Sequence, residues 1–305
     1  SDTVISIIYV QFYSFTIEII NLILLLFYME ILKWKRNLEL DYGYTTNKLL
    51  VVGDTSRDIS KVIEDYTLID EAGVDYILQQ IPNSKNIFHG QGIDLGGGVS
   101  LISSCIMKFF NPEKIFCLEI VEEVVKTCHE KVQAFILGKK PDNIISVVGD
   151  FDHIELPDDS LDFIIFWDSL HHARDPTISL QECKRVVKND GFVIIIDKVH
   201  NNSIPDNEIE RMLNIQYDES FLERSFRAKD TVLLRKDDGE HEYRFFEWEN
   251  FFKISGFDII ENFLIKTETQ TNKNTKNDNN LKEIFVKFNV GGFQQQKIIY
   301  VLQPN

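Results

Sequence analysis

Between residues 90 and 200, short apolar segments alternate regularly with longer segments of helical periodicity. The expected strands are residues 92–95, 114–118, 144–148, 161–167 and 192–197. The expected helices, in which apolar residues recur at helical spacing, are residues 99–110, 121–137 and 177–187. Such alternation favours right-handed βαβ units and a parallel sheet covered on both faces. The sequence therefore predicts an α/β, Rossmann-like, doubly wound sheet.

The segments that flank this core complete a single domain over residues 37–305. Residues 37–90 are expected to cover the front of the sheet, with a helix over 70–81 that leads into the first strand. After the core, the expected elements are a helix over 207–222, a small hairpin from 231–234 and 243–246, a helix over 248–254, and strands over 257–266 and 297–302. The last two strands are predicted to form an antiparallel C-terminal edge of the mostly parallel sheet. Residues 199–245 would form a lid insertion, and the polar run TETQTNKNTKNDNN, at about 267–280, predicts a mobile loop.

The N-terminal segment, residues 1–36, predicts a hydrophobic helix. From Val4 to Leu32 the only charged residues are Glu18 and Glu30, and a basic cluster follows at 33–36. A membrane-spanning helix needs about 20 mostly apolar residues, with basic residues on its cytoplasmic side. Residues 3–32 could thus anchor the chain to a membrane, although an acid within the span would be costly. The alternative is a hydrophobic helix packed on the domain or on a second subunit.

Charge and cysteine content narrow the partners and the compartment. The formal net charge is −16, which argues against nucleic acid as the main partner. The four cysteines show neither a CxxC pair nor a spacing typical of metal sites, which favours a reduced, intracellular compartment. We therefore expect a cytoplasmic protein without a metal site, attached to the cytoplasmic face of a membrane if residues 3–32 are an anchor. The oligomeric state stays open.

Three consecutive glycines, Gly96, Gly97 and Gly98, follow the first expected strand in the run GIDLGGGVS. Glycine inside a strand or helix costs about 0.5–1 kcal/mol relative to alanine, so three together indicate a sharp turn or the close approach of a ligand. In open α/β sheets ligands bind beyond the carboxyl ends of the strands, where backbone amides at a helix start are available. The glycines therefore predict a ligand-binding loop.

An acid at the end of the second strand is the next expected feature of a site for an adenosine cofactor. Glu119 lies there, 23 residues after Gly96, and its carboxylate could accept hydrogen bonds from both ribose hydroxyls. A dinucleotide site would need a third glycine where Leu101 stands, and no apparatus for hydride transfer follows. A nicotinamide-dependent oxidoreductase is therefore disfavoured.

Four blocks in order extend this pattern across residues 91–198. They are IDLGGG at 93–98, LE at 118–119, VGDF at 148–151 followed by LPDDSLD at 156–162, and WDSLHH at 167–172 followed by DP at 175–176 and ECKRVVKNDG at 182–191. Together they resemble the class I S-adenosylmethionine-dependent methyltransferases, particularly the type 11 small-molecule group. The resemblance implies S-adenosylmethionine (SAM) as the cofactor.

The resemblance also implies roles for particular residues. Asp94 and the glycines Gly96, Gly97 and Gly98 would approach the methionine end of the cofactor. Glu119 would hold the ribose, and Ile120 would lie against the adenine. Asp150 would accept from the adenine amino group, with Phe151 beside the ring. Asp168 would face the cofactor amino group or the substrate. One residue departs from the family pattern, since Ser100 stands where the family has a third glycine, and serine disfavours a positive φ.

Methyl transfer to a hydroxyl requires alignment of the reactants and benefits from a base of near-neutral pKa, a task that suits histidine. His171 and His172 follow the fourth strand on the expected substrate side, and His241 is a further candidate. Each could instead cap a helix or pack beneath a loop. We expect an enzyme that methylates an oxygen of a small acceptor, such as a sugar, a nucleotide-sugar, a quinone-like ring or a lipid-linked compound. The alternative is a non-catalytic scaffold that binds SAM or its demethylated product, or a membrane-tethered subunit of a biosynthetic complex.

Overall fold

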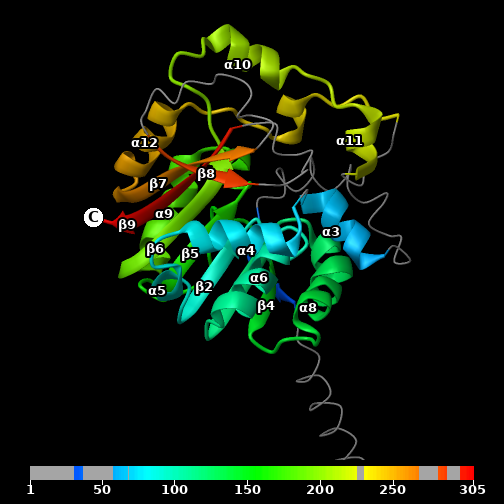
Figure 1. Ribbon diagram of the computed structural model, residues 1–305, viewed down its shortest axis with the longest axis vertical. Coiled ribbons are helices and arrows are strands. Elements are labelled where there is room, and N and C mark those ends of the chain that lie inside the picture. Colours follow the sequence, from blue (N-terminus) through cyan, green and yellow to red (C-terminus); the bar gives the residue numbers. More distant parts are fainter. Residues whose placement is uncertain (1–30, 37–57, 68, 225–229, 268–280, 287–295) are drawn as a thin grey trace, which may run out of the picture. The chain divides into compact units, whose positions relative to one another are not determined.

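A computed structural model describes residues 31–36, 58–67, 69–224, 230–267, 281–286 and 296–305 (Figure 1). Most of the expected N-terminal helix, the first part of the segment over 37–90, and the expected loop after Thr267 lie outside these residues. The chain divides into two units, Ser1–Leu32 and Lys33–Asn305, and the fold below is that of the second unit. Among the described residues, no helix has both the length and the apolar character needed to cross a membrane.

The described strands form a nine-stranded sheet in the order β1-β4-β3-β2-β5-β6-β9-β7-β8. Their bounds are Leu32–Lys33 (β1), Gln91–Leu95 (β2), Lys114–Glu119 (β3), Ile144–Val148 (β4), Leu161–Trp167 (β5), Val187–Lys198 (β6), Phe257–Thr267 (β7), Lys282–Val286 (β8) and Lys297–Pro304 (β9). Strands β4, β3, β2, β5 and β6 are parallel, whereas β9 is antiparallel to both β6 and β7. The predicted Rossmann-like sheet with antiparallel pairing at its C-terminal side is confirmed. Strand β8, which pairs in parallel with β7, was not expected from the sequence.

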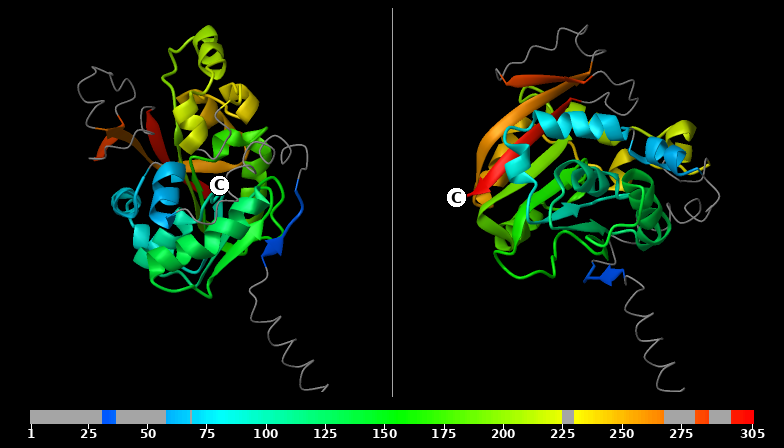
Figure 2. Two further views of the ribbon diagram at one scale, coloured as in Figure 1. Left: turned by 90° about the vertical axis from the view of Figure 1, so that its right-hand side faces the viewer. Right: turned by 60° about the horizontal axis from the view of Figure 1, so that its bottom comes forward.

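Helices cover both faces of the sheet, as the views in Figures 1 and 2 show. On one face lie α3 (Ile59–Thr67), α4 (Glu71–Gln80), α5 (Ser84–Ile87), α6 (Leu101–Phe110), α7 (Glu122–Val124) and α8 (Glu130–Leu137), and on the other lie α9 (Pro176–Val186) and α12 (Phe245–Ile254). Strand β5 feeds both cores, since Phe163 and Ile165 belong to the first and Ile164 and Phe166 to the second. Successive side chains of an apolar strand point to opposite faces of the sheet, so the strand contributes to a hydrophobic core on each face.

Strand β6 begins earlier than the sequence indicates. The strand was expected over 192–197, but β6 follows α9 directly from Val187. The buried Val187 pairs with Leu161, and the pairing then shifts register before Phe163. A Cβ at Gly191 would lie 2.9 Å from the Asp162 carbonyl oxygen, so this glycine permits a close approach of two strands.

The insertion after β6 differs most from expectation. In place of one helix over 207–222, the chain forms α10 (Asp206–Leu213) and α11 (Glu219–Arg224), because Gln216 bridges to Leu234 between them. The hairpin from 231–234 and 243–246 is wrong. Residues 235–238 form a short 3₁₀-helix, η3 (Arg235–Asp238), and α12 starts at Phe245 because the Glu247 carboxylate accepts from the Arg244 N–H at 2.7 Å. None of the residues of α10 is buried.

Candidate functional site

The predicted site residues gather at the carboxyl ends of the parallel strands. Each strand from β2 to β6 has a polar residue of the site at or near its carboxyl end, namely Asp94, Glu119, Asp150, Asp168 and Asp197. Because β9 runs in the opposite direction, its first residue, Lys297, pairs with Lys198 at the end of β6 and reaches the same edge. The structure thus brings together residues from six strands at the place where an open α/β sheet binds its ligands.

The glycine loop between β2 and α6 is closely packed. Gly96 and Gly98 have φ values of +75° and +53°. A Cβ at Gly96 would lie 2.6 Å from the Ser169 Cβ, and one at Gly97 would lie 2.5 Å from the Cys117 Sγ. The N–H groups of Gly96 and Gly97 donate to the Leu118 carbonyl at 2.9 and 2.8 Å. The first two glycines therefore allow the loop to lie against β3 and the segment that follows β5.

Two buried carboxylates flank this loop. Asp94 accepts hydrogen bonds from the N–H and the hydroxyl of Ser103 at 3.1 and 2.6 Å, and burial raises its pKa to about 6. Glu119 accepts from the N–H groups of Gly98 and Val121 at 3.1 and 2.9 Å. The backbone thus holds the predicted ribose acid in place. Its oxygens are acceptors only, which suits hydroxyl ligands.

The residues predicted to hold the adenine follow β3 and β4. Asp150 is buried and accepts from the Asp152 N–H at 2.8 Å. The Phe151 ring lies edge-on to Phe166, with ring centroids 5.8 Å apart. The Ile120 carbonyl accepts from the Arg36 guanidinium at 2.9 Å, a contact that the sequence gave no reason to expect. The positions fit an adenine subsite, and the individual roles stay predictions.

On the other side of the sheet centre, His171 forms a buried pair with Asp197. His171 lies in the 3₁₀-helix η2 (Leu170–His172) after β5, and Asp197 is the penultimate residue of β6. The His171 Nδ1 donates to the Asp197 Oδ1 at 2.7 Å, and the His171 backbone N–H donates to the other carboxylate oxygen at 3.1 Å. Asp197 was missed at the sequence level, although an acid in an otherwise apolar strand was the available signal.

The other two candidate histidines support the same segment. The His172 Nδ1 donates to the Gly239 carbonyl at 3.1 Å, and the His172 ring centroid lies 4.1 Å from that of His171. The His241 Nδ1 donates to the His171 carbonyl at 2.8 Å. The structure therefore brings all three histidines together. Only His171 among them has its Nδ1 oriented by a carboxylate, as a general base requires.

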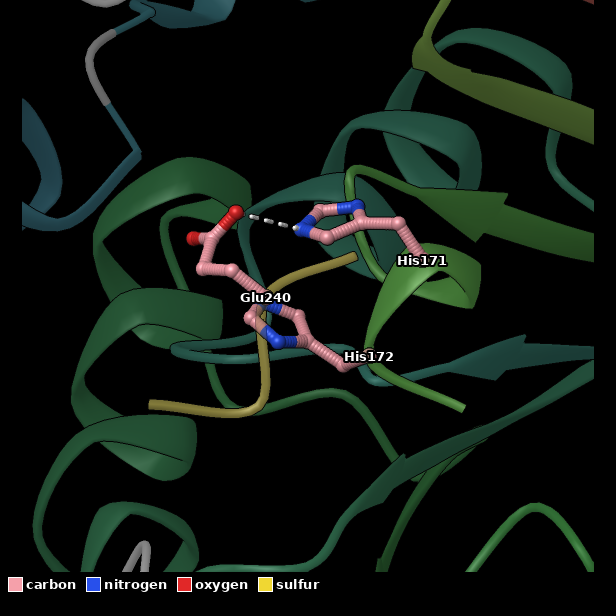
Figure 3. Close-up of side chains that lie close together, drawn as sticks. All are labelled: His171, His172 and Glu240. Carbon is pink, nitrogen blue, oxygen red and sulfur yellow. Dashed lines mark ion pairs between the residues drawn. The ribbon is translucent and has the colours of Figure 1, made fainter. Parts of the chain in front are cut away.

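Glu240 completes this cluster (Figure 3). Its Oε2 lies 3.6 Å from the His171 Nε2. Lys198 also pairs with Glu240, Arg235 donates to it at 3.2 Å, and the Tyr217 hydroxyl donates at 3.0 Å. Burial opposes ionisation, but Lys198 and the neighbouring histidines hold the pKa of Glu240 well below its ordinary value. His171, His172 and Glu240 each offer a ligand atom within 4.8 Å of the others, as a metal site would. Because Lys198 and Arg235 already supply positive charge to this carboxylate, the geometry favours an ion-pair network.

Glu242 extends the ion-pair network. It accepts from Lys198 at 3.2 Å and from His200 at 2.6 Å, and it pairs with Arg235. These contacts join the end of β6 to residues 235–242 of the insertion, more than 30 residues later in the chain. The insertion is therefore fastened to the sheet by buried charges.

Asp168, the residue that follows β5, has a strained backbone conformation. Its φ is +53°, and its N–H donates to the Ile196 carbonyl at 2.7 Å. Its carboxylate pairs with Lys297, and this ammonium group lowers the pKa of Asp168 to about 2. A non-glycine residue keeps a positive φ only where the surrounding structure holds it there, and such strained residues are frequent at functional sites. Lys297, 129 residues further along the chain, could not be assigned from the sequence.

The central part of the chain matches a known protein family. Residues 93–195 match the family described as a methyltransferase domain.

Among solved structures, the chain is similar to a SAM-dependent methyltransferase from Aquifex aeolicus, with 18% identity, a TM-score of 0.47, and coverage of 81% of this chain and 99% of that one. It is also similar to a candidate sarcosine dimethylglycine methyltransferase from Galdieria sulphuraria, with 23% identity and a TM-score of 0.49. That match covers 62% of this chain and 63% of the Galdieria chain, which is less than two thirds of its length. No curated protein sequence matches the chain. The family match over residues 93–195 supports a SAM-dependent methyltransferase, with SAM as the methyl donor.

Proposed function

We propose that this SAM-dependent methyltransferase methylates an oxygen of a small-molecule acceptor, such as a sugar, a nucleotide-sugar or a lipid-linked compound. The observation that carries the proposal is the buried His171–Asp197 pair, 2.7 Å apart, at the strand edge that also bears the glycine loop. The two parts of the site are in contact, since the Ser169 hydroxyl donates to the Leu95 carbonyl at 2.7 Å.

The residues of the glycine loop suit the methyl donor. Glu119 would accept from the ribose hydroxyls, and Asp94 and Asp168 would lie near the positively charged methionine end. When bound, SAM supplies a methyl group that its sulfonium sulfur already activates. The protein therefore needs mainly to align the acceptor, exclude water and remove one proton.

His171 would remove that proton. Asp197 accepts from Nδ1–H, which leaves Nε2 as the basic nitrogen. When an acceptor hydroxyl takes the methyl group, the methyl–sulfur bond would break, the sulfur would leave as the neutral thioether of the demethylated product, and the hydroxyl proton would pass to Nε2. The resulting imidazolium would lie between the carboxylates of Asp197 and Glu240, which would stabilise its charge. His172 and His241 would hold residues 239–242 against His171.

The acceptor classes follow from the charged surroundings of His171 and from the chain's N-terminal segment. Side chains rich in hydrogen-bond donors and acceptors favour a polyhydroxylated acceptor over an apolar one. We place the protein in the cytoplasm, and an anchor over residues 3–32 would bring it to the cytoplasmic face of a membrane and favour a lipid-linked acceptor.

The test is methyl transfer from methyl-labelled SAM to panels of free sugars, nucleotide-sugars and lipid-linked glycans, with product analysis by mass spectrometry. We expect label on an oxygen, with loss of transfer in His171→Gln and little change in His89→Gln, a substitution of an exposed histidine. Label found only on a nitrogen or sulfur acceptor, or full activity in His171→Gln, would contradict it.

A further inference from the structure

Ser100, the last residue before α6, has a backbone conformation that glycine favours. Its φ is +72°, and it is fully buried. Its N–H donates to the Gly97 carbonyl at 2.8 Å, and its carbonyl accepts from the Ser104 hydroxyl at 2.6 Å. The end of the glycine loop therefore requires a left-handed residue, and here a side chain that disfavours this conformation adopts it.

Two buried side chains from one helical segment donate hydrogen bonds to this loop. The Gln133 amide donates to the Ser100 Oγ at 3.1 Å, and the His129 Nε2 donates to the Gly98 carbonyl at 2.9 Å. Both residues are nearly inaccessible to solvent, at 1% exposed for His129 and 2% for Gln133. They are four residues apart, so both lie on the same helix face.

The helix and the neighbouring strand fix the orientation of these side chains. His129 ends a π-helical turn, η1 (Val125–His129), a feature that is often found at functional sites. The His129 Nδ1 lies 3.0 Å from the Ser146 hydroxyl of β4, and Gln133 also donates to that hydroxyl at 3.4 Å. Because the Gly98 carbonyl can only accept, the proton of the ring is on Nε2, and Nδ1 accepts from Ser146.

The same loop residue, Gly98, also contacts Glu119, the acid proposed to hold the ribose. The Gly98 N–H donates to the Glu119 carboxylate at 3.1 Å, while its carbonyl accepts from His129. A rotation of this loop would therefore move both the Glu119 carboxylate and the backbone groups available to the cofactor.

We infer that Gln133 and His129 are positioning residues, which hold the loop in the conformation that binds SAM even though Ser100 replaces the residue best suited to it. Gln133 acts through the Ser100 hydroxyl, and His129 acts through the Gly98 carbonyl. Neither is proposed to touch the cofactor. The inference depends on SAM as the methyl donor and not on the identity of the acceptor.

The test is a double-mutant cycle on the full chain, with the dissociation constant for SAM measured by calorimetry. Gln133→Met removes the amide at nearly constant length, and Ser100→Gly removes both the hydroxyl and the conformational demand. Gln133→Met should weaken SAM binding about tenfold when Ser100 is present, because a buried hydroxyl loses its donor. In the Ser100→Gly background the same substitution should weaken SAM binding about twofold or less, since the hydrogen bond between residues 133 and 100 is already absent.

Two further variants make the result specific. Ser100→Ala keeps the conformational demand and loses only the hydroxyl, so it should bind SAM more weakly than Ser100→Gly. His129→Leu should weaken binding equally in both backgrounds, because it acts on Gly98. Thermal unfolding of each protein shows whether a change in affinity is independent of global stability.

Equal losses from Gln133→Met in both backgrounds would overturn the inference, as would equal affinities of Ser100→Ala and Ser100→Gly. A folded wild-type chain that does not bind SAM would instead overturn the assignment of the cofactor, and this inference with it.

Discussion

The two halves of the site are built from different interactions. The half proposed to bind the cofactor, here called the cofactor half, lies at the ends of β2, β3 and β4. Its side chains accept hydrogen bonds from backbone N–H groups, as Glu119 does from Gly98 and Val121. In the acceptor half, at the ends of β5, β6 and β9, side chains of opposite charge are paired across long sequence separations, as Lys198 is with Glu240 and Glu242. The cofactor half is held mainly by hydrogen bonds that involve the backbone, whereas the acceptor half is held mainly by ion pairs between side chains.

The difference predicts that the two halves respond differently to substitution. Backbone hydrogen bonds depend little on the side chains around them. A buried ion pair, in contrast, requires each partner, because removal of one leaves an uncompensated charge. Substitutions should therefore separate the halves: those in the cofactor half should change the affinity for SAM, and those in the acceptor half should change turnover or stability.

The largest expected effect concerns turnover. His171→Gln should lower kcat by about 10²–10⁴-fold, the usual contribution of a general base. The affinity for SAM should stay close to that of the wild type, because the contacts of Glu119 and the glycine loop are unchanged. Steady-state kinetics and calorimetry on the same preparation test both statements. A parallel loss of SAM affinity would show that the halves are not separable at this residue.

The second effect concerns stability. Lys198→Met should lower the free energy of unfolding by about 3–5 kcal/mol, because it leaves two buried carboxylates with fewer positive partners. Urea denaturation measures this change. The matched control is Arg211→Met, which breaks an exposed pair with Glu208 on α10 and should cause no measurable change. If both variants were equally stable, the ion-pair network would not be what fastens the insertion.

The third effect is on the affinity for SAM. Glu119→Gln should weaken binding about 10–100-fold, because an amide offers one acceptor oxygen in place of two and loses the charge. The exposed acid Glu113 provides the control, and Glu113→Gln should bind SAM as the wild type does. Retained affinity in Glu119→Gln would remove the ribose role from this residue.

The smallest effect is a pH dependence within the cofactor half. Burial lowers the pKa of His129 to about 4, whereas an unfolded histidine titrates near 6.5. Between these values the unfolded chain binds a proton that the folded chain does not, so stability is present above about pH 6.5 and declines as the pH falls towards 4. Between pH 7 and pH 5, the free energy of unfolding of the wild type should fall by on the order of 1–2 kcal/mol more than that of His129→Gln, as measured by urea denaturation. An identical pH dependence of the two proteins would contradict a buried, neutral His129.

The cofactor half was predictable because its residues follow one another along the chain. The glycines and Glu119 come directly after apolar strands, and strand periodicity alone brings their positions to one edge. His129 and Gln133 were not predictable as loop contacts, because they lie within a helix whose periodicity gives no sign of the π turn.

The acceptor half was only partly predictable. His171, His172 and His241 were identified by residue type, and the structure brings them together. Asp197 and Glu240, the partners of His171, and Lys297, the partner of Asp168, were not identified, because these pairs form across 26 or more residues. The expected hairpin at 231–246 failed for the same reason, since its segments bridge to Gln216 and His200 and not to each other.

The most direct test of the account is a calorimetric titration of the full chain with SAM and with its demethylated product. A variant that carries both Glu119→Ala and Asp150→Ala serves as the control, with folding checked by circular dichroism. The account predicts binding in the micromolar range for the wild type and none for the control. A folded wild type that binds neither ligand, or a control that binds as tightly as the wild type, would contradict the assignment of the cofactor half.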